Sequence, residues 1–297
     1  MMTQLTAAPE EAAAWLKRGE AVAFPTETVY GLGASVWSLA GLERIYEAKG
    51  RPADNPLIVH VSSRAQAAEV GAPNAMAEVL MEHFFPGPLT VVLTRRPVVP
   101  SRVTAGLDTV GVRMPAHATA QAFLQACDAP VAAPSANRSG RPSPTTWQAV
   151  LEDLNGRIAC ILEGEPSTVG LESTVVDCVH DPPLLLRPGA VSLEALQAVC
   201  PTLSVASATH FSARRSPGTR HRHYAPRARV VLVASPAQVP GGRAHAFIGL
   251  APAPDILGYQ QVVSDLAEYA QHLFAFFRAC DAAGIDTIFC QTVSAGG

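Results

Sequence analysis

Short apolar runs alternate with amphipathic stretches along the first 200 residues, and this alternation predicts an α/β fold. The runs that predict strands are 20–24, 57–61, 89–94, 109–114, 130–133, 158–162, 173–178 and 184–186. Helical spacing predicts helices over 7–18, 39–48, 64–70, 74–85, 119–126, 146–154 and 192–199. Because the last three strands follow one another without a helix between them, we expect a twisted mixed sheet with helices.

The pattern lapses over about 202–229, where Ser, Ala, Arg, His and Pro dominate, and then a smaller α/β pattern begins. Strands are predicted over 230–233, 246–250 and 286–290, with a helix over 265–283. The sequence therefore predicts a first domain over 1–203, a linker or lid over 204–228, and a small Rossmann-like α/β domain over 229–297.

Two segments of the first domain are predicted to be loops with a defined backbone conformation. Thr26–Gly33 carries hydroxyls and two glycines, which suit close backbone approach. Lys49–Pro56 carries two cations among a glycine and two prolines, which keep it out of regular structure. A rigid loop that presents Lys49 and Arg51 suits a multiply charged anion, and as loop charges the two side chains are expected to contribute little to stability.

Polar side chains recur inside or at the ends of the apolar strand patterns. They are Thr26, Thr28, His60, Arg113, Ser135, Asn137, Ser173, Thr174 and Arg187. Ligand groups in α/β sheets collect at strand ends, and buried polar groups need partners. Each residue alone is more simply read as a cap, a turn or a paired core residue, but together they predict one concave, basic cavity.

Composition narrows the class of protein. The chain has 297 residues, 48% of them hydrophobic, and a formal charge of −3, so an anion site has to be a local patch. The six cysteines form no CxxC pair, and no secretory signal or membrane-length apolar run is visible. We therefore expect a cytoplasmic protein with no membrane association. Phosphate-loop and dinucleotide fingerprints, HExxH and a Ser/His/Asp grouping are all absent.

Seven ordered segments resemble the motif series of the YrdC-like family. They are Pro25–Gly33, Lys49–Leu57, Phe85–Thr90, Val110–Pro115, Ala133–Gly140, Glu172–Asp177 and Leu186–Gly189. The segment from Ser216 to Pro226 and the small second domain resemble the long, two-domain threonylcarbamoyl-AMP synthases of that family. The chain ends just after a predicted strand, where that family's second domain usually continues into a last helix, so we expect a variant or incomplete end.

The resemblance implies a nucleotidyltransferase. L-Threonine, bicarbonate or CO2, and ATP with Mg2+ would give threonylcarbamoyl-AMP, which other proteins transfer to a tRNA adenosine. Lys49 and Arg51 would be the catalytic cations, and no protein side chain is implied as a metal ligand. The implied threonine contacts are Thr28, His60, Arg113, Ala133 and Ser173. The implied ATP contacts are Arg51, Asn55, Thr109, Ser135, Asn137, Ser143, Arg187 and Tyr224.

Two other readings stay open at this stage. One is a YrdC-like carbamoyl transferase, although the additional modules usual in such proteins are not visible. The other is a double-stranded RNA-binding module, against which the net charge of −3 argues, since RNA affinity comes chiefly from phosphate neutralisation. Weak RNA binding is also possible for an enzyme of this family, in addition to its catalytic activity.

Overall fold

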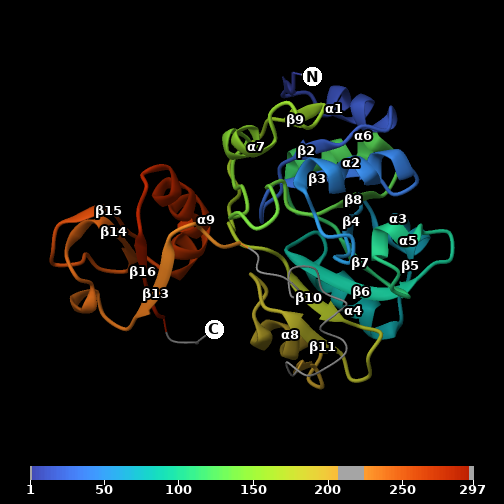
Figure 1. The fold of residues 1–297 in the computed structure, drawn as a ribbon. Helices are drawn as coiled ribbons and strands as arrows, with labels where there is room; N and C mark the ends of the chain where they lie inside the picture. Colours follow the sequence, from blue (N-terminus) through green and yellow to red (C-terminus); the bar gives the residue numbers. More distant parts are fainter. Residues whose placement is uncertain (1, 207–223, 294–297) are drawn as a thin grey trace.

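The computed structural model describes residues 2–206 and 224–293, and in that part the strands form two separate sheets (Figure 1). The first sheet spans residues 4–205 and the second spans 229–291. Most of the predicted linker lies outside the described residues. The domain bounds 1–203, 204–228 and 229–297 stay a prediction.

The first sheet is mixed, as expected, and has twelve strands within the described residues. Across the sheet the order is β1 (Gln4–Thr6), β9 (Cys160–Leu162), β2 (Val22–Phe24), β3 (Gly31–Ser35), β8 (Val131–Ala133), β4 (Ile58–His60), β7 (Thr109–Arg113), β6 (Leu89–Arg95), β10 (Thr174–Asp177), β11 (Leu184–Arg187) and β12 (Ser204–Val205), with β5 (Gly71–Ala72) paired to β6. In the parallel pair β4–β7, His60 lies opposite Arg113. The register therefore places two of the predicted site residues side by side.

Helices cover both faces of this sheet. They are α1 (Pro9–Lys17), α2 (Leu39–Lys49), α3 (Arg64–Val70), α4 (Ala75–Phe84), α5 (Ser101–Thr104), α6 (Ala118–Cys127), α7 (Trp147–Leu154) and α8 (Leu193–Val199). Val22 and Phe24 of β2 pack in one apolar cluster with α1 and α6, whereas Ala23 packs in another with α2, α4 and α7. This alternation follows from the two-residue period of a strand, and it buries the sheet on both sides.

The C-terminal end of α2 carries Lys49, one of the predicted site residues. Ser38 caps the helix by accepting a hydrogen bond from the Gly41 N–H, and Gly50 ends it in the left-handed conformation at φ 60°. Lys49 is thus the last helical residue, with only 4% of its surface exposed, and is not an exposed loop charge. The premise that Lys49 is an exposed loop charge was therefore wrong, because its ammonium group is buried and hydrogen-bonded.

The predicted loop over 26–33 was also partly wrong, because Gly31–Ser35 forms the strand β3. Its glycines do permit close approach. A Cβ atom at Gly33 would lie 2.6 Å from Cγ1 of Val131 and 2.9 Å from the ring of Phe24. Without side chains at these positions, β3 can pass between its neighbours. The apolar patterns also missed several short elements, namely β1, β5, α5 and β12.

The second sheet is wholly parallel within the described residues. Its order is β13 (Arg229–Val233), β16 (Thr287–Gln291), β14 (Gly242–Gly249) and β15 (Leu257–Val262), and a 3-10 turn, η2 (Pro236–Gln238), follows β13. The long helix α9 (Leu266–Ala282) packs on one face, with Asp265 as its N-terminal cap. Val29 and Leu171 of the first unit join the same apolar cluster, so the two units share a hydrophobic contact. No helix of the described part is long and apolar enough to cross a membrane.

Candidate active site

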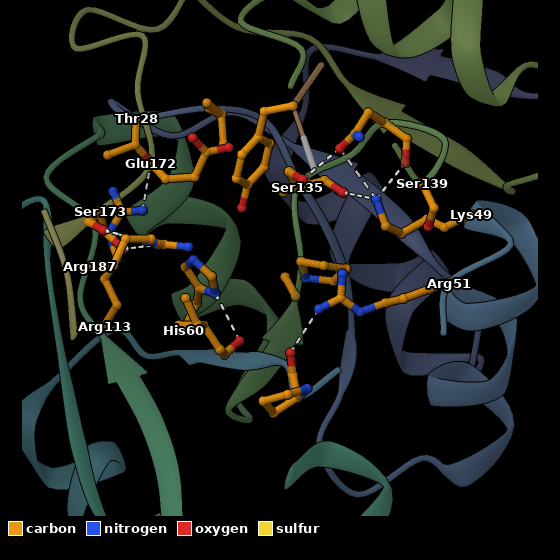
Figure 2. A pocket seen from close by; sticks show the side chains of 18 residues that line it. Thr28, Lys49, Arg51, His60, Arg113, Ser135, Ser139, Glu172, Ser173 and Arg187 are labelled. Carbon is orange, nitrogen blue, oxygen red and sulfur yellow. Dashed lines mark hydrogen bonds between the residues drawn. The ribbon is translucent and has the colours of Figure 1, made fainter. Parts of the chain in front are cut away.

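One cavity collects most of the predicted site residues, and Figure 2 shows the side chains that line it. The predicted residues in its lining are Thr28, Lys49, Arg51, His60, Arg113, Ala133, Ser135, Asn137, Ser173, Arg187 and Tyr224. They come from strand ends, from the end of α2, and from the residues that precede β13. The expected convergence of polar strand ends is therefore present, whereas the ligand contacts assigned to individual residues stay predictions.

Arg113 occupies the C-terminal end of β7 and is almost fully buried. Its Nη2 lies 2.7 Å from Oε1 of Glu27, its Nη1 donates to Oγ1 of Thr28 at 2.6 Å, and its Nε donates to the Gly87 carbonyl at 3.2 Å. The guanidinium is thus held from several sides before any ligand is bound. A fixed guanidinium of this kind suits recognition of a carboxylate.

His60, on β4, lies beside Arg113 of the neighbouring strand β7. Its ring packs edge-on against the ring of Phe24, with 5.5 Å between ring centroids. Burial, together with the Arg113 charge, lowers the pKa of His60 to about 3. The imidazole is therefore neutral at physiological pH, and it presents a polar edge without a charge. Ala133 lies opposite Ile58 across the β4–β8 pair, and both residues line the cavity.

Arg187, at the C-terminal end of β11, hydrogen-bonds to Ser173, which directly precedes β10. Its Nε and Nη2 donate to the Ser173 carbonyl at 3.1 and 2.9 Å, and Nη2 also lies 3.2 Å from the Ser173 hydroxyl. That hydroxyl is 2.8 Å from Oγ1 of Thr90. Arg187 and Ser173 therefore form a polar unit on the same side of the cavity as Arg113 (Figure 2).

Lys49 and Arg51 line the opposite side (Figure 2). Lys49 Nζ donates to the carbonyls of Ser135 and Asn137 and lies 3.4 Å from the Asn137 side-chain oxygen. Arg51 donates to the Pro56 carbonyl at 2.8 Å and to the Asn55 carbonyl at 3.3 Å. Burial is the main cause that lowers the pKa of both side chains, for Lys49 well below its ordinary value. A bound polyanion would favour the charged form of both groups.

Two residues of the predicted polar set, Thr26 and Thr174, do not line the cavity, because their hydroxyls donate to the carbonyls of Val29 and Val191.

Three of the predicted ATP contacts also do not line the cavity. Asn55 lies behind Arg51, and its carbonyl also accepts from the Tyr46 hydroxyl. Thr109 begins β7, the strand whose other end carries Arg113, so the strand separates it from the cavity. Ser143 is buried behind Glu172 and donates to its Oε1.

The sequence reasoning did not assign Glu172 and Ser139, which both line the cavity. Glu172 is the one carboxylate among the described lining residues. Burial raises its pKa, while Arg187 and the Ser143 hydroxyl oppose that rise. The signal was present in the sequence, because Glu172 directly precedes Ser173 in one of the seven segments. Ser139 lies in the polar loop after Asn137 and donates its N–H to the Lys49 carbonyl at 3.0 Å.

The donor set favours anions over a metal held by protein alone. Lys49, Arg51, Arg113 and Arg187 line a cavity to which Glu172 adds one acidic group. Among the described residues, no three His, Cys, Asp or Glu side chains group closely enough to hold a metal ion. A Mg2+ ion would therefore be held mainly by its ligand's own oxygens, and Glu172 is the one carboxylate of the described lining that could add to them.

The mixed α/β sheet thus carries a cavity lined by cations near its strand ends, and such a lining suits anionic ligands. Comparison with known proteins gives the class. Residues 14–189 match a family model described as telomere recombination, and residues 191–297 match the threonylcarbamoyl-AMP synthase C-terminal domain.

Relatives and solved structures agree with these matches. The chain is 42% identical to a threonylcarbamoyl-AMP synthase of Pyrococcus abyssi, over 96% of this chain and 89% of the relative. It is 47% identical to that of Bacillus subtilis, over 75% of this chain and 65% of the relative. A structure of P. abyssi Sua5 complexed with L-threonine aligns at a TM-score of 0.89 and 38% identity, covering 100% of this chain and 93% of that one. The chain therefore belongs to the threonylcarbamoyl-AMP synthase family.

Proposed function

We propose that this chain is a nucleotidyltransferase that condenses L-threonine, bicarbonate and ATP into threonylcarbamoyl-AMP, pyrophosphate and water. The water comes from bicarbonate, which takes up a proton and dehydrates to CO2; with CO2 itself as the substrate, the same condensation releases no water. The observation that carries the proposal is the convergence of Lys49, Arg51, Arg113 and Arg187 on one cavity. The family membership supports it, and so does the related P. abyssi Sua5 structure, which is complexed with L-threonine.

The first step would form a carbon–nitrogen bond. The neutral amine of threonine attacks the carbon of CO2 and loses a proton, which gives an N-carboxylate. Arg113 would hold the threonine carboxylate, with neutral His60, Thr28 and Ser173 around the amino acid. Glu172, with its raised pKa, is the nearest acidic side chain to take up the amine proton.

The second step would form the adenylate. An oxygen of the N-carboxylate attacks the α-phosphorus of ATP in line, and the bond to the β-phosphate bridging oxygen breaks to release pyrophosphate. Lys49, Arg51 and Arg187 would neutralise the charge that develops on the phosphates. Catalysis by positioning and charge stabilisation needs no protein nucleophile.

Mg2+ enters this scheme with the nucleotide. When bound, it would screen the phosphate charges and orient the polyphosphate, which is the usual way in which this ion serves nucleotide chemistry. The chain itself would contribute the cations Lys49, Arg51 and Arg187 and the carboxylate of Glu172, which line the cavity. A requirement for Mg2+ is tested by measuring pyrophosphate release with and without added magnesium.

The proposal is tested by substrate dependence. The purified protein should release pyrophosphate and form an adenylate only when threonine, bicarbonate and ATP are all present. ATP turnover that is independent of threonine, with no adenylate product, would contradict the proposal. A salt titration with double-stranded RNA is the matching test of the RNA-binding reading, which predicts retention at physiological salt. Transfer of the product to tRNA by other proteins follows from the same proposal.

A further inference from the structure

Helix α9 of the second unit docks on the first unit close to the site. At Gly170, which has φ +74°, an added Cβ would lie 2.4 Å from Cα of Gln271 on α9. The Gln271 side chain donates to the Ser167 carbonyl at 3.4 Å. This close backbone approach makes α9 a fixed neighbour of the first unit.

Arg278 of α9 makes a charged contact across this junction, and only 9% of its surface is exposed. Its Nη2 donates to Oδ2 of Asp153 at 2.7 Å and its Nη1 donates to Oδ1 at 3.3 Å, which is a two-pronged pairing. Nη2 also donates to the Pro142 carbonyl at 2.7 Å. A planar guanidinium fork fixes its partners more tightly than a lysine ammonium can.

Asp153, on α7, collects several donors and has no exposed side-chain surface. It accepts a hydrogen bond from the main-chain N–H of Arg138 at 3.2 Å and another from the guanidinium of Arg141. Together with the contact at Pro142, Asp153 and Arg278 hold residues 138–142 at both ends. These residues form no helix or strand.

The held segment supports the cavity wall. The Asn137 amide donates to the carbonyls of Arg138 and Arg141 at 2.9 and 2.8 Å. The Asn137 carbonyl in turn accepts from Lys49 Nζ, and Asn137 and Ser139 both line the cavity. Contacts therefore run without a break from Arg278, through Asp153 and residues 138–142, to Asn137 and Lys49.

We propose that Arg278 is a positioning residue of the nucleotide site, which acts from the second unit by fixing residues 138–142 so that Asn137 and Ser139 face the phosphates. This inference rests on the proposed function, because it places the phosphates of ATP against that wall. It makes the second unit a working part of the active site.

The test compares variants on one helix. Arg278→Met removes the fork, Arg278→Lys keeps the charge, and Gln271→Ala changes a contact of the same junction away from residues 138–142. We expect Arg278→Met to raise the KM for ATP by about tenfold to a hundredfold, as small displacements of a positioned group do, while the KM for threonine stays near its wild-type value. Arg278→Lys should recover part of the loss, and Gln271→Ala should behave as wild type.

Thermal unfolding and threonine binding separate positioning from folding. If Arg278→Met is folded at the assay temperature and binds threonine as the wild type does, but keeps the raised KM for ATP, the positioning role stands. The proposal is overturned if the KM for ATP in Arg278→Met equals that of the wild type, or if both substrates weaken equally in this variant.

Calorimetric titration of ATP keeps this test distinct from the proposed function. If the wild type binds ATP but forms no adenylate, the proposed function fails. The ratio of ATP affinities between the wild type and Arg278→Met still decides the role of Arg278: weaker ATP binding by the variant supports it, and equal affinities overturn it.

Discussion

Arg113 and Glu27 form a buried ion pair at the back of the cavity, with Nη2 of the arginine 2.7 Å from Oε1 of the glutamate. Glu27 itself does not line the cavity, whereas Arg113 does. The free protein thus supplies Arg113 with a counter-charge from behind. A threonine carboxylate bound in front would add a second anionic partner.

Replacing Glu27 by Gln should destabilise the protein, because it leaves the buried Arg113 charge without its partner. The free energy of unfolding should fall by roughly 3–5 kcal/mol, which is typical of breaking a buried pair. Saturating threonine should raise the unfolding temperature more in Glu27→Gln than in the wild type, since the substrate carboxylate supplies the missing charge. Urea and thermal unfolding with and without threonine check both effects.

The matched control for this prediction is Glu43→Gln. Glu43 pairs with Arg102 on the surface at 2.8 Å, and exposed pairs contribute little to stability. The control should unfold like the wild type and gain no extra stabilisation from threonine. If threonine raised the unfolding temperature equally in all three proteins, Arg113 would not be the residue that binds the threonine carboxylate.

Lys49 should make ATP binding depend on pH. Burial lowers the pKa of its ammonium in the free protein, and phosphate beside it would raise that pKa again. Between the two pKa values, binding should take up as much as about one proton, and ATP affinity should fall as the pH rises through this window. Calorimetry in two buffers of different ionisation enthalpy measures the uptake.

Two variants assign that proton. Lys49→Met should abolish the uptake, whereas Glu172→Gln should retain it if Lys49 is the group that titrates. The reverse pattern would assign the proton to Glu172, whose pKa burial raises. Lys49→Met should also lower stability, because the carbonyls of Ser135 and Asn137 lose their buried donor.

Much of this arrangement could be predicted from the sequence, because the signals were local. The predicted helix over 64–70 matches α3, where the Ser63 side chain caps the N-terminus. β15 was missed because Gly258, Tyr259 and Gln260 are exposed, so the strand shows no apolar run. The partners of the site residues depend on contacts between distant parts of the chain. Arg278 and Asp153 are 125 positions apart, and no local pattern relates them.

His60 should make stability fall in acid. Its pKa is about 3 when folded and its ordinary value is 6.5, so in this window the unfolded chain binds the extra proton. Stability is therefore present above pH 6.5 and is lost as the pH falls toward 3. Urea unfolding between pH 6.5 and 5 should show this slope, and His60→Gln should make it shallower. Some slope should remain, because burial also lowers the pKa of His117.

Tyr224 contacts helix α9 of the second unit and also lines the cavity. Its ring lies 5.8 Å from that of Phe274 on α9, and it lines the cavity with Arg51 and Arg187. Burial raises the pKa of Tyr224 to about 12, so the hydroxyl stays protonated, and Arg187 opposes the rise through its charge and a hydrogen bond. Because residues 207–223 lie outside the described part, Tyr224 is the residue at which we test the predicted lid function of residues 204–228.

Tyr224→Ala should weaken ATP binding more than threonine binding, because it removes both the ring and the hydroxyl beside Arg51 and Arg187. Tyr224→Phe keeps the ring and should lose only what the hydroxyl contributes, about 0.5–1.5 kcal/mol, or roughly twofold to tenfold in affinity. Calorimetric titrations of each substrate into both variants give the comparison. If ATP affinity is unchanged in Tyr224→Ala, residues 204–228 serve as a tether, and the nucleotide is held by the first unit alone.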